Sequence, residues 1–481
     1  MSESRFGGQV LAGFMNGLMH RKAMSLDSLR PDQRLNPTLS WWHLVALGVG
    51  AIVGTGIYTL TGVCANLAGP AVIVAFAIAG GICACAALTY AEVATMIPTS
   101  GSAYTYTYVV IGEVVAWVVG WSMILEYSVG TSAVAVGWSG YATGFLGGIG
   151  VHLPHALTTG LYAGGLVNLP AIFIVYLVSA LLIVGTRESA TVNVVLVLVK
   201  MAALALFVAI AAPHVNVANF HPFMPYGFFS HDVDGAKRGV MAGAAVIFFA
   251  FYGFDALSTA AEETKDPGRN LPIGIIGSML VCTVIYVAVA ATAVGSTYFA
   301  NFVGSPEPLA LILRQLGQDG AAKLLGAAVV IAIPTVILAF LYGQSRIFFV
   351  MARDGLMPQS LAKVNAVTKT PVRMTLITAT AVALLAGLAP LKDIALLANA
   401  GTLTAFVAVS VCMLIMRVRM PDAPRVYRTP LAWVVGPAAI LGCVYLFTNL
   451  TVTTMLFFLA WNVIGFGIYF LIRPRTPQTA A

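Results

Sequence analysis

Three ionisable residues, Glu126, Lys200 and Asp255, lie well inside long apolar stretches of the sequence. A charge in such surroundings costs on the order of several kcal/mol unless it is paired or solvated, so a functional role is the first hypothesis for each. A buried carboxylate can receive a cation or a proton, and a buried amine can exchange a proton because burial disfavours its charged form. These residue types therefore indicate a site that binds charged groups, moves protons, or does both.

Each of these residues also has a simpler interpretation. Lys200 is either a proton-coupling group or a fixed structural cation that pairs with Glu126 or with a backbone carbonyl. Asp255 and Glu126 can receive the charged end of a substrate's lysine or arginine side chain, hold their helices in place, or form part of a proton path. Glu92, near the cytoplasmic end of the second predicted helix, is a candidate to pair with Arg353-Asp354, after the eighth, as an internal gate. Solvated interfacial charges are the alternative.

The elements that position these charges must be membrane helices. Of 481 residues, 59% are hydrophobic and only 9% are charged, whereas a soluble domain carries about 25% charged residues because its surface faces water. The apolar excess must face lipid, which excludes an ordinary soluble protein and predicts an all-α polytopic membrane protein. The six cysteines lie in apolar stretches and are expected to be small buried hydrophobic residues. The sequence shows no nucleotide-binding loop and no catalytic triad, so neither an enzyme nor an ATP-driven pump is expected.

Runs of about 20 apolar residues, the length that crosses the hydrocarbon core, predict twelve helices. They lie near residues 44–67, 71–96, 112–145, 169–186, 190–212, 238–261, 271–297, 321–352, 372–390, 393–418, 431–449 and 452–472. The run near 112–145 is longer than one membrane thickness, so its helix is expected to tilt strongly or to project beyond the bilayer.

The loops predict how the chain is placed in the membrane. Lys and Arg are concentrated in the loops on the side of the N-terminus, which places both termini in the cytoplasm. A cytoplasmic segment at 1–40 precedes one transmembrane domain at 41–472, and a cytoplasmic tail follows at 473–481. Within the first segment, apolar spacing near 6–24 predicts either an amphipathic helix on the inner membrane surface or a partly ordered tail.

Two of the predicted helices contain glycines at mid-membrane. The first carries four glycines between residues 48 and 56, Gly54 among them, and the sixth carries Gly253 beside Asp255 in an aromatic run. Glycines in a membrane helix can simply allow close packing against a neighbour. A matching pair of interrupted helices is instead the best sequence pointer to a transporter binding site. We favour the second interpretation because both breaks occur.

The positions of the two breaks also predict an internal repeat. Each interrupted helix opens a set of five predicted helices, at about 44–212 and about 238–418. An odd number of helices in each set makes the second copy inverted relative to the first. The remaining two helices, at about 431–472, are expected to be peripheral.

Backbone exposed at such breaks has a specific chemistry. Free N–H groups at the start of a half-helix carry a positive partial charge and suit a carboxylate. Free carbonyls at the end of the opposing half-helix suit an ammonium group or another cation. A site that offers both fits a zwitterion, which is the part that all α-amino acids share.

Several motifs resemble the amino acid–polyamine–organocation superfamily, and within it the bacterial form of the cationic amino acid transporter family. The resemblance covers nearly the whole chain, from about Leu39 to Leu471. Its motifs are Gly50-Ala51-Ile52-Val53-Gly54-Thr55-Gly56-Ile57, the Phe249–Asp255 run with the following Glu262-Glu263, Gln344-Ser345-Arg346, and Arg353-Asp354-Gly355-Leu356-Met357-Pro358.

The resemblance implies a LeuT fold, with twelve transmembrane helices, a five-plus-five inverted repeat and discontinuous helices one and six. It implies that the amides around Thr55 and Gly56 bind the substrate carboxylate. It further implies that the α-ammonium group is bound by the carbonyls of Ile52, Phe249, Ala250 and Tyr252. In the resembled family Phe249 would also be an aromatic gate, and the eighth helix near Ala339 would contribute to selectivity for the substrate side chain.

Proton-driven relatives place a lysine of the fifth helix where sodium-driven relatives hold a sodium ion, and Lys200 resembles that lysine. The resemblance therefore implies proton-coupled symport of L-amino acids, including cationic ones, by alternating access. The alternatives are an amino acid exchanger without net proton coupling and an amino acid sensor that does not transport. The expected location is a bacterial inner membrane. The expected partners are an L-amino acid, a proton and the bilayer, with room for a small single-helix membrane subunit, and no nucleic acid, cofactor or metal is expected.

Overall fold

The computed structural model describes Arg21 and residues 39–99, 101–184, 190–233, 235–261, 264–358 and 372–472. The predicted N-terminal amphipathic helix, the tail at 473–481 and the Glu262-Glu263 pair lie outside the described residues, Arg21 excepted.

Membrane-length helices dominate the described part of the chain. Eight helices are long and apolar enough to cross a membrane: Leu60–Met96, Glu113–Gly148, Asn193–His214, Val240–Thr259, Pro267–Ser296, Asp319–Arg353, Leu391–Arg419 and Val452–Ile472. Shorter apolar helices occur at Trp41–Ile52, Leu169–Ile183, Val372–Leu388 and Ala432–Thr448. Each predicted span coincides with one of these long or short helices, except that the helix Leu60–Met96 joins the end of the first predicted span to the second. That all twelve cross the membrane stays a prediction.

The first half of the chain contains α2 (Trp41–Ile52), α3 (Thr55–Tyr58), α4 (Leu60–Ala68), α5 (Val72–Met96), α6 (Ser102–Val110), α7 (Glu113–Gly148), α8 (His155–Thr158), α9 (Leu169–Val184) and α10 (Ala190–Ala211). A two-stranded antiparallel hairpin follows, with β1 (His231–Val233) and β2 (Ala236–Arg238). The second half contains α11 (Val240–Ile247), α12 (Asp255–Thr259), α13 (Pro267–Ser296), α14 (Pro308–Gln315), α15 (Asp319–Ala332), α16 (Pro334–Arg353), α17 (Val372–Leu388), α18 (Leu391–Arg419), α19 (Ala432–Thr448) and α20 (Val452–Ile472).

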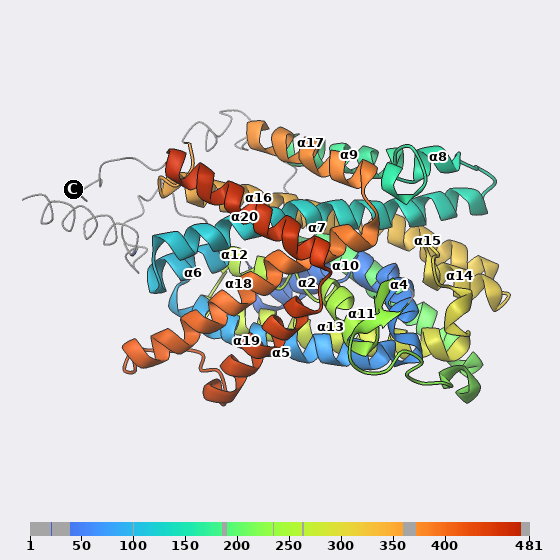
Figure 1. Ribbon diagram of the computed structural model, residues 1–481, viewed down its shortest axis with the longest axis horizontal. Helices are drawn as coiled ribbons and strands as arrows, with labels where there is room; N and C mark the ends of the chain where they lie inside the picture. The colour runs from blue at the N-terminus through green and yellow to red at the C-terminus, as the bar shows by residue number, and fades with distance from the viewer. Residues whose placement is uncertain are drawn as a thin grey trace, which may run out of the picture.

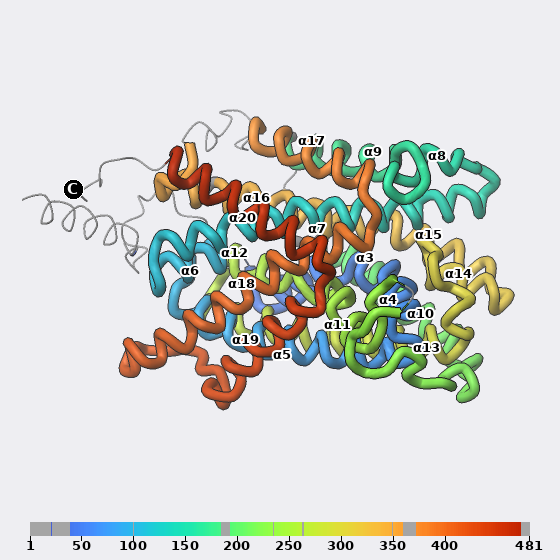
Figure 2. Tube along the Cα trace, viewed as in Figure 1, coloured from blue at the N-terminus to red at the C-terminus, as the bar shows by residue number. Residues whose placement is uncertain are grey.

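The short helices of the two interrupted segments lie at the middle of the molecule. Most longer helices run roughly along its long axis, with α7 and α20 on one side of α2, α11 and α12 in this view and α5 and α19 on the other (Figure 1). The α14–α15 region and α6 mark opposite ends (Figure 2). The helix α7 packs against both α16 and α18, and α2 packs against α10 and α13. Side chains from α7, α10, α13 and α18 are thereby brought to the interrupted segments.

Candidate functional site

The first interrupted segment separates α2 from α3. Val53 has an extended backbone, with φ −75° and ψ 98°, and its amide still donates to Val49 O (2.8 Å). Gly54 follows at φ −148° and ψ −148°. The next backbone amide along the chain that donates a helical hydrogen bond is that of Tyr58, to Gly54 O. Among the described residues, the amides at 54–57 have no backbone acceptor. Free N–H groups are therefore present at the start of α3.

Side chains from two other helices bind the carbonyls released at the end of α2. The Gly50 carbonyl would be bonded by the amide four residues later in a continuous helix, but here it accepts from Lys200 Nζ of α10 (2.8 Å). The Ile52 carbonyl accepts from the Tyr286 hydroxyl of α13 (2.9 Å). Lys200 therefore contacts a backbone carbonyl of the first interrupted helix.

The second interrupted segment separates α11 from α12. After Ile247 the chain makes one 3₁₀ turn at Phe248–Ala250 and then a turn through Gly253, which has φ +118°. A left-handed backbone of this kind favours glycine. Asp255 closes the turn, because its Oδ1 accepts from the Gly253 amide (3.1 Å) and its Oδ2 accepts from the Tyr127 hydroxyl (2.8 Å).

The two interrupted segments touch each other directly. A Cβ placed on Gly56 would lie 2.3 Å from Ala250 Cα, and one placed on Gly253 would lie 3.0 Å from the carbonyl carbon of Ala51. Only glycine allows so close an approach of two backbones. The freed amides of the first segment are thus brought against the second segment.

The predicted binding residues converge on this contact and are buried. All six are buried: Ile52, Thr55, Gly56, Phe249, Ala250 and Tyr252. The Phe249 and Tyr252 rings meet edge to face with centroids 4.9 Å apart. Ala339 of α16 is half-buried, and its neighbour Phe340 is the residue that stacks on Tyr252, at 5.1 Å and 15° between planes.

Glu126 of α7 lies beside these residues with an unsatisfied side chain. It is 1% exposed, and neither of its carboxylate oxygens has a hydrogen-bond partner among the described residues. The Tyr252 hydroxyl is likewise unpaired there, and it lies against Gly130, one helical turn from Glu126. Buried polar groups are normally hydrogen-bonded. The oxygens of Glu126 and Tyr252 are therefore available to bind a ligand or, for Glu126, a proton.

Comparison with known proteins assigns the chain to a family. A model of the amino acid permease family matches residues 39–472. The chain belongs to the amino acid permease family. Over 95% of its length it is 46% identical to a branched-chain amino acid permease and 41% identical to a methylthioribose transporter, both of Bacillus subtilis, and it covers 98% of each. It is also 35% identical over 85% of its length to a vacuolar cationic amino acid transporter of Arabidopsis thaliana, of which it covers 68%.

Family membership confirms the resemblance found in the sequence and supports a multi-pass membrane transporter. It also agrees with the predicted membrane helices. Cationic amino acid transporters recur among the relatives, together with a second branched-chain permease, from Lactococcus lactis.

The permease has two buried polar residues that sequence reasoning missed. Asn399 of α18 donates its side-chain amide to Ala245 O (2.7 Å) and Val246 O (3.3 Å), just before the second interruption. Tyr286 binds the first interruption, as described above. The sequence carried one signal for Asn399, a lone amide within an apolar helix, but nothing in it indicated the carbonyls that this amide binds.

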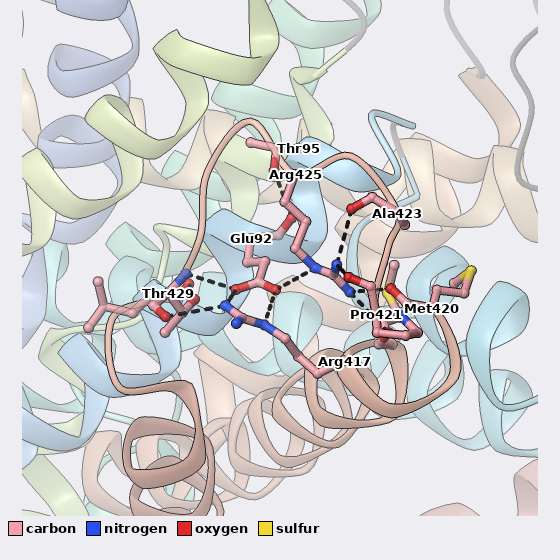
Figure 3. Close-up of polar contacts among 10 residues, drawn as sticks. Glu92, Thr95, Arg417, Met420, Pro421, Ala423, Arg425 and Thr429 are labelled. Atoms are coloured by element: carbon pink, nitrogen blue, oxygen red, sulfur yellow. Dashed lines mark hydrogen bonds and ion pairs between the residues drawn. The ribbon is translucent and has the colours of Figure 1, made fainter.

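The predicted partner of Glu92 was wrong. In the permease, Glu92 of α5 is 1% exposed and accepts two hydrogen bonds from Arg417 of α18, at 2.7 and 2.6 Å. Arg425 Nε and the Thr429 amide donate to the same carboxylate (Figure 3). Glu92 is therefore neither a solvated interfacial charge nor the partner of Arg353. Arg417 belongs to the last turn of α18, and the other two partners, Arg425 and Thr429, follow in a loop whose fold the sequence did not indicate.

Proposed function

We propose that this protein is a secondary active transporter that imports L-amino acids together with protons by alternating access. The observation that supports this most directly is the contact between two interrupted helices, where free amides of one segment face the backbone of the other. Discontinuous helices of this kind form substrate and ion sites in secondary transporters. Closure around the substrate would follow from contacts that only the closed state makes.

The proposed architecture is the LeuT fold with twelve transmembrane helices. Repeat one would cover about 44–212, repeat two about 238–418, and peripheral helices about 431–472, within one domain at 41–472. Both termini would be cytoplasmic and the membrane would be a bacterial inner membrane. In support, the two interruptions occur in the first helix of each proposed repeat. The hydrophobic patterning and the loop charges support the rest.

The shared part of the substrate would bind to backbone groups. Its carboxylate would accept from the amides around Thr55 and Gly56, which have no backbone acceptor among the described residues. Its ammonium group would donate to carbonyls of Ile52, Phe249, Ala250 and Tyr252. The Ile52 carbonyl already accepts from Tyr286 and has a second lone pair for the substrate.

The variable part of the substrate would meet an aromatic surface and one acid. Phe249, as a gate, and Tyr252 with its stacked partner Phe340 would cover an apolar side chain, and Ala339 would border it from α16. Glu126 would receive a polar or cationic end, because its oxygens are unpaired among the described residues. Asp255 already binds two donors. Its proposed role is therefore to hold the turn that shapes the site, with substrate contact second.

Lys200 would couple transport to the proton. A protonated amine donates to Gly50 O as observed, while a neutral amine is a far weaker donor, so the end of α2 would be held differently in the two states. Sodium would have no role in this scheme. The alternative of an exchanger without net proton coupling keeps the same substrate site and gives Lys200 a fixed structural role.

Uptake by purified protein in proteoliposomes tests the proposal. A pH gradient, acidic outside, is expected to drive accumulation of a labelled amino acid, and Lys200→Met is expected to abolish the gradient effect while exchange of internal for external substrate continues. Lys323→Met, in the loop-proximal part of α15, is the matched control. Exchange without gradient-driven accumulation in the wild type would contradict symport, and binding without any uptake would favour a sensor.

A competition panel tests the substrate class. The relatives' names supply its members: branched-chain amino acids, arginine and lysine, and methylthioribose. The aromatic surface predicts that branched-chain amino acids compete well. Competition by arginine that disappears in Glu126→Gln would assign the cationic end to Glu126.

A further inference from the structure

Two side chains bind the interrupted helices at the same place in each. Lys200 donates to Gly50 O, and Gly50 is the third residue from the end of α2. Asn399 donates to Ala245 O, and Ala245 is the third residue from the end of α11. Both side chains are fully buried, at 0% exposure.

The two contacts also occupy corresponding places along the chain. Lys200 lies in the helix at 190–211 and Asn399 in the helix at 391–419, which are the last helices of the two proposed repeats. The donor lies 150 residues after its acceptor in the first case and 154 in the second. A side-chain donor from the last helix of each set of five therefore binds a carbonyl near the end of that set's interrupted helix.

The physical need for such a donor is the same at both places. The last carbonyls of a helix have no amide partner, and a carbonyl inside the membrane that finds no other donor costs on the order of several kcal/mol. A side chain from a neighbouring helix satisfies it and fixes where the helix stops. The chemical difference lies in the donors, because an amide keeps its N–H groups at every ordinary pH while an amine gains or loses a proton.

We propose that Asn399 is the positioning residue of the second interruption and the uncharged counterpart of Lys200. Asn399 holds the end of α11 in the same way whatever the pH, so that of these two helix-end contacts only the one at Gly50 changes with protonation. The carboxyls near the second interruption, Asp255 and Glu126, take no part in either contact. This inference rests on the proposed function, since it assigns the two interruptions separate tasks in one transport cycle.

Substitution of Asn399 separates this role from a general effect on folding. Asn399→Ala is expected to weaken substrate affinity about tenfold in exchange assays, because the second half of the site loses its anchor. The ratio of uptake with a pH gradient to uptake without one is expected to stay at the wild-type value. Lys200→Asn is expected to give the opposite result, with substrate affinity largely kept and the gradient effect lost.

Asn399→Asp supplies a readout that a purely structural role would not move. An aspartate has the same shape, donates one hydrogen bond when protonated and only accepts when ionised. The affinity of this variant relative to wild type is therefore expected to fall as the pH is raised, whereas that of Asn399→Ala stays level. Because the aspartate can be studied at low pH, this test remains decisive even where the alanine variant fails to fold.

Asn462 provides the matched control. Its amide also donates to a helix carbonyl, Phe458 O (2.9 Å), but within its own helix α20. Asn462→Ala is expected to leave affinity and the gradient effect unchanged. Wild-type affinity in Asn399→Ala, or a pH-independent Asn399→Asp, would overturn the inference. If the wild type itself shows no gradient-driven accumulation, the proposed function is overturned instead. The effect of the Asn399 substitutions on substrate affinity can still be measured in that case.

Discussion

Glu92 and Glu126 are two glutamates with the same burial and opposite surroundings. Each is 1% exposed. Glu92 accepts four hydrogen bonds, from two arginines and the Thr429 amide, whereas the oxygens of Glu126 have no partner among the described residues. Burial alone therefore does not mark a functional charge. The number of donors left for a ligand or a proton distinguishes the two.

The surroundings of Glu92 show what a structural charge requires. Arg425 binds the carboxylate through Nε and uses its remaining nitrogens to bind carbonyls at and after the end of α18, including Met416 O (3.0 Å) and Met420 O (2.8 Å) (Figure 3). Thr429 also donates to Leu88 O of α5 (2.8 Å). One carboxylate thus joins α5, the end of α18 and the loop that leads to α19.

Replacing Glu92 is expected to have the largest effect of any substitution considered. Glu92→Gln leaves the buried Arg425 side chain and the partly exposed Arg417 without their counter-charge, and breaking a buried pair in this way typically costs about 3–5 kcal/mol. The expected result is a low yield of folded protein and a much lower melting temperature in detergent. A melting temperature equal to that of wild type would show that the cluster is not a structural anchor and would remove the contrast with Glu126.

Glu126→Gln is the matched substitution on the other side of the comparison. Because no hydrogen bond is lost and an unpaired buried acid is replaced by a neutral group, stability is expected to stay the same or rise. Transport of the best substrate is expected to fall about tenfold or more, since the site loses its only unpaired acid among the described residues. Uptake and thermal melting measured on the same preparation check both halves. A variant that melts early and still transports would reverse the assignment.

The sequence predicted the membrane helices and the location of the interruptions better than it predicted polar partners. Hydrophobic runs are long and continuous, and the glycines at 54 and 253 stand out within them, so these features can be found without a structure. The residues bound to the interruptions cannot be found in this way. Tyr286 and Asn399 bind carbonyls 234 and about 154 residues away, and no local pattern records such a distance.

Glu92 illustrates the limit most clearly. Its position near the end of a predicted helix suggested a charge at the membrane surface, and a nearby loop offered Arg353 as its partner. One partner, Arg417, lies in the last turn of α18, and the others belong to a loop whose path depends on the guanidinium of Arg425 and its bonds to backbone carbonyls. Which of several arginines reaches an acid depends on tertiary packing, so the choice cannot be read from a local pattern in the sequence.

Tyr127→Phe extends the comparison to Asp255, which has fewer hydrogen-bond donors than Glu92 and more than Glu126. Asp255 binds the Tyr127 hydroxyl and the Gly253 amide, so the substitution removes one of its two donors and leaves the ring that meets Phe340 edge to face. Leaving a buried acceptor unpaired costs about 1–3 kcal/mol. A moderate drop in melting temperature and a several-fold rise in KM are expected. An unchanged KM would show that the turn at Gly253 does not depend on the bond between Tyr127 and Asp255.

Glu307 offers the smallest and most specific test, at a site outside the membrane-spanning helices. Its carboxylate is seated against Gly144 and pairs with Arg314 (2.5 Å) beside a small hollow that Asp319 and Lys323 also line. Burial raises the pKa of the Glu307 carboxyl, and Arg314 offsets only part of that effect.

A group with a raised pKa in the folded state stabilises the fold when protonated. The contribution of Glu307 to stability is therefore complete below its pKa in the unfolded chain and is lost as the pH rises through its pKa in the folded state. The melting temperature of wild type relative to Glu307→Gln should therefore fall as the pH rises from about 4, the ordinary range of a glutamate, through the raised pKa of the folded state. A difference that grows with pH would mean that the pair with Arg314 outweighs burial, which would place Glu307 with Glu92 as a structural charge.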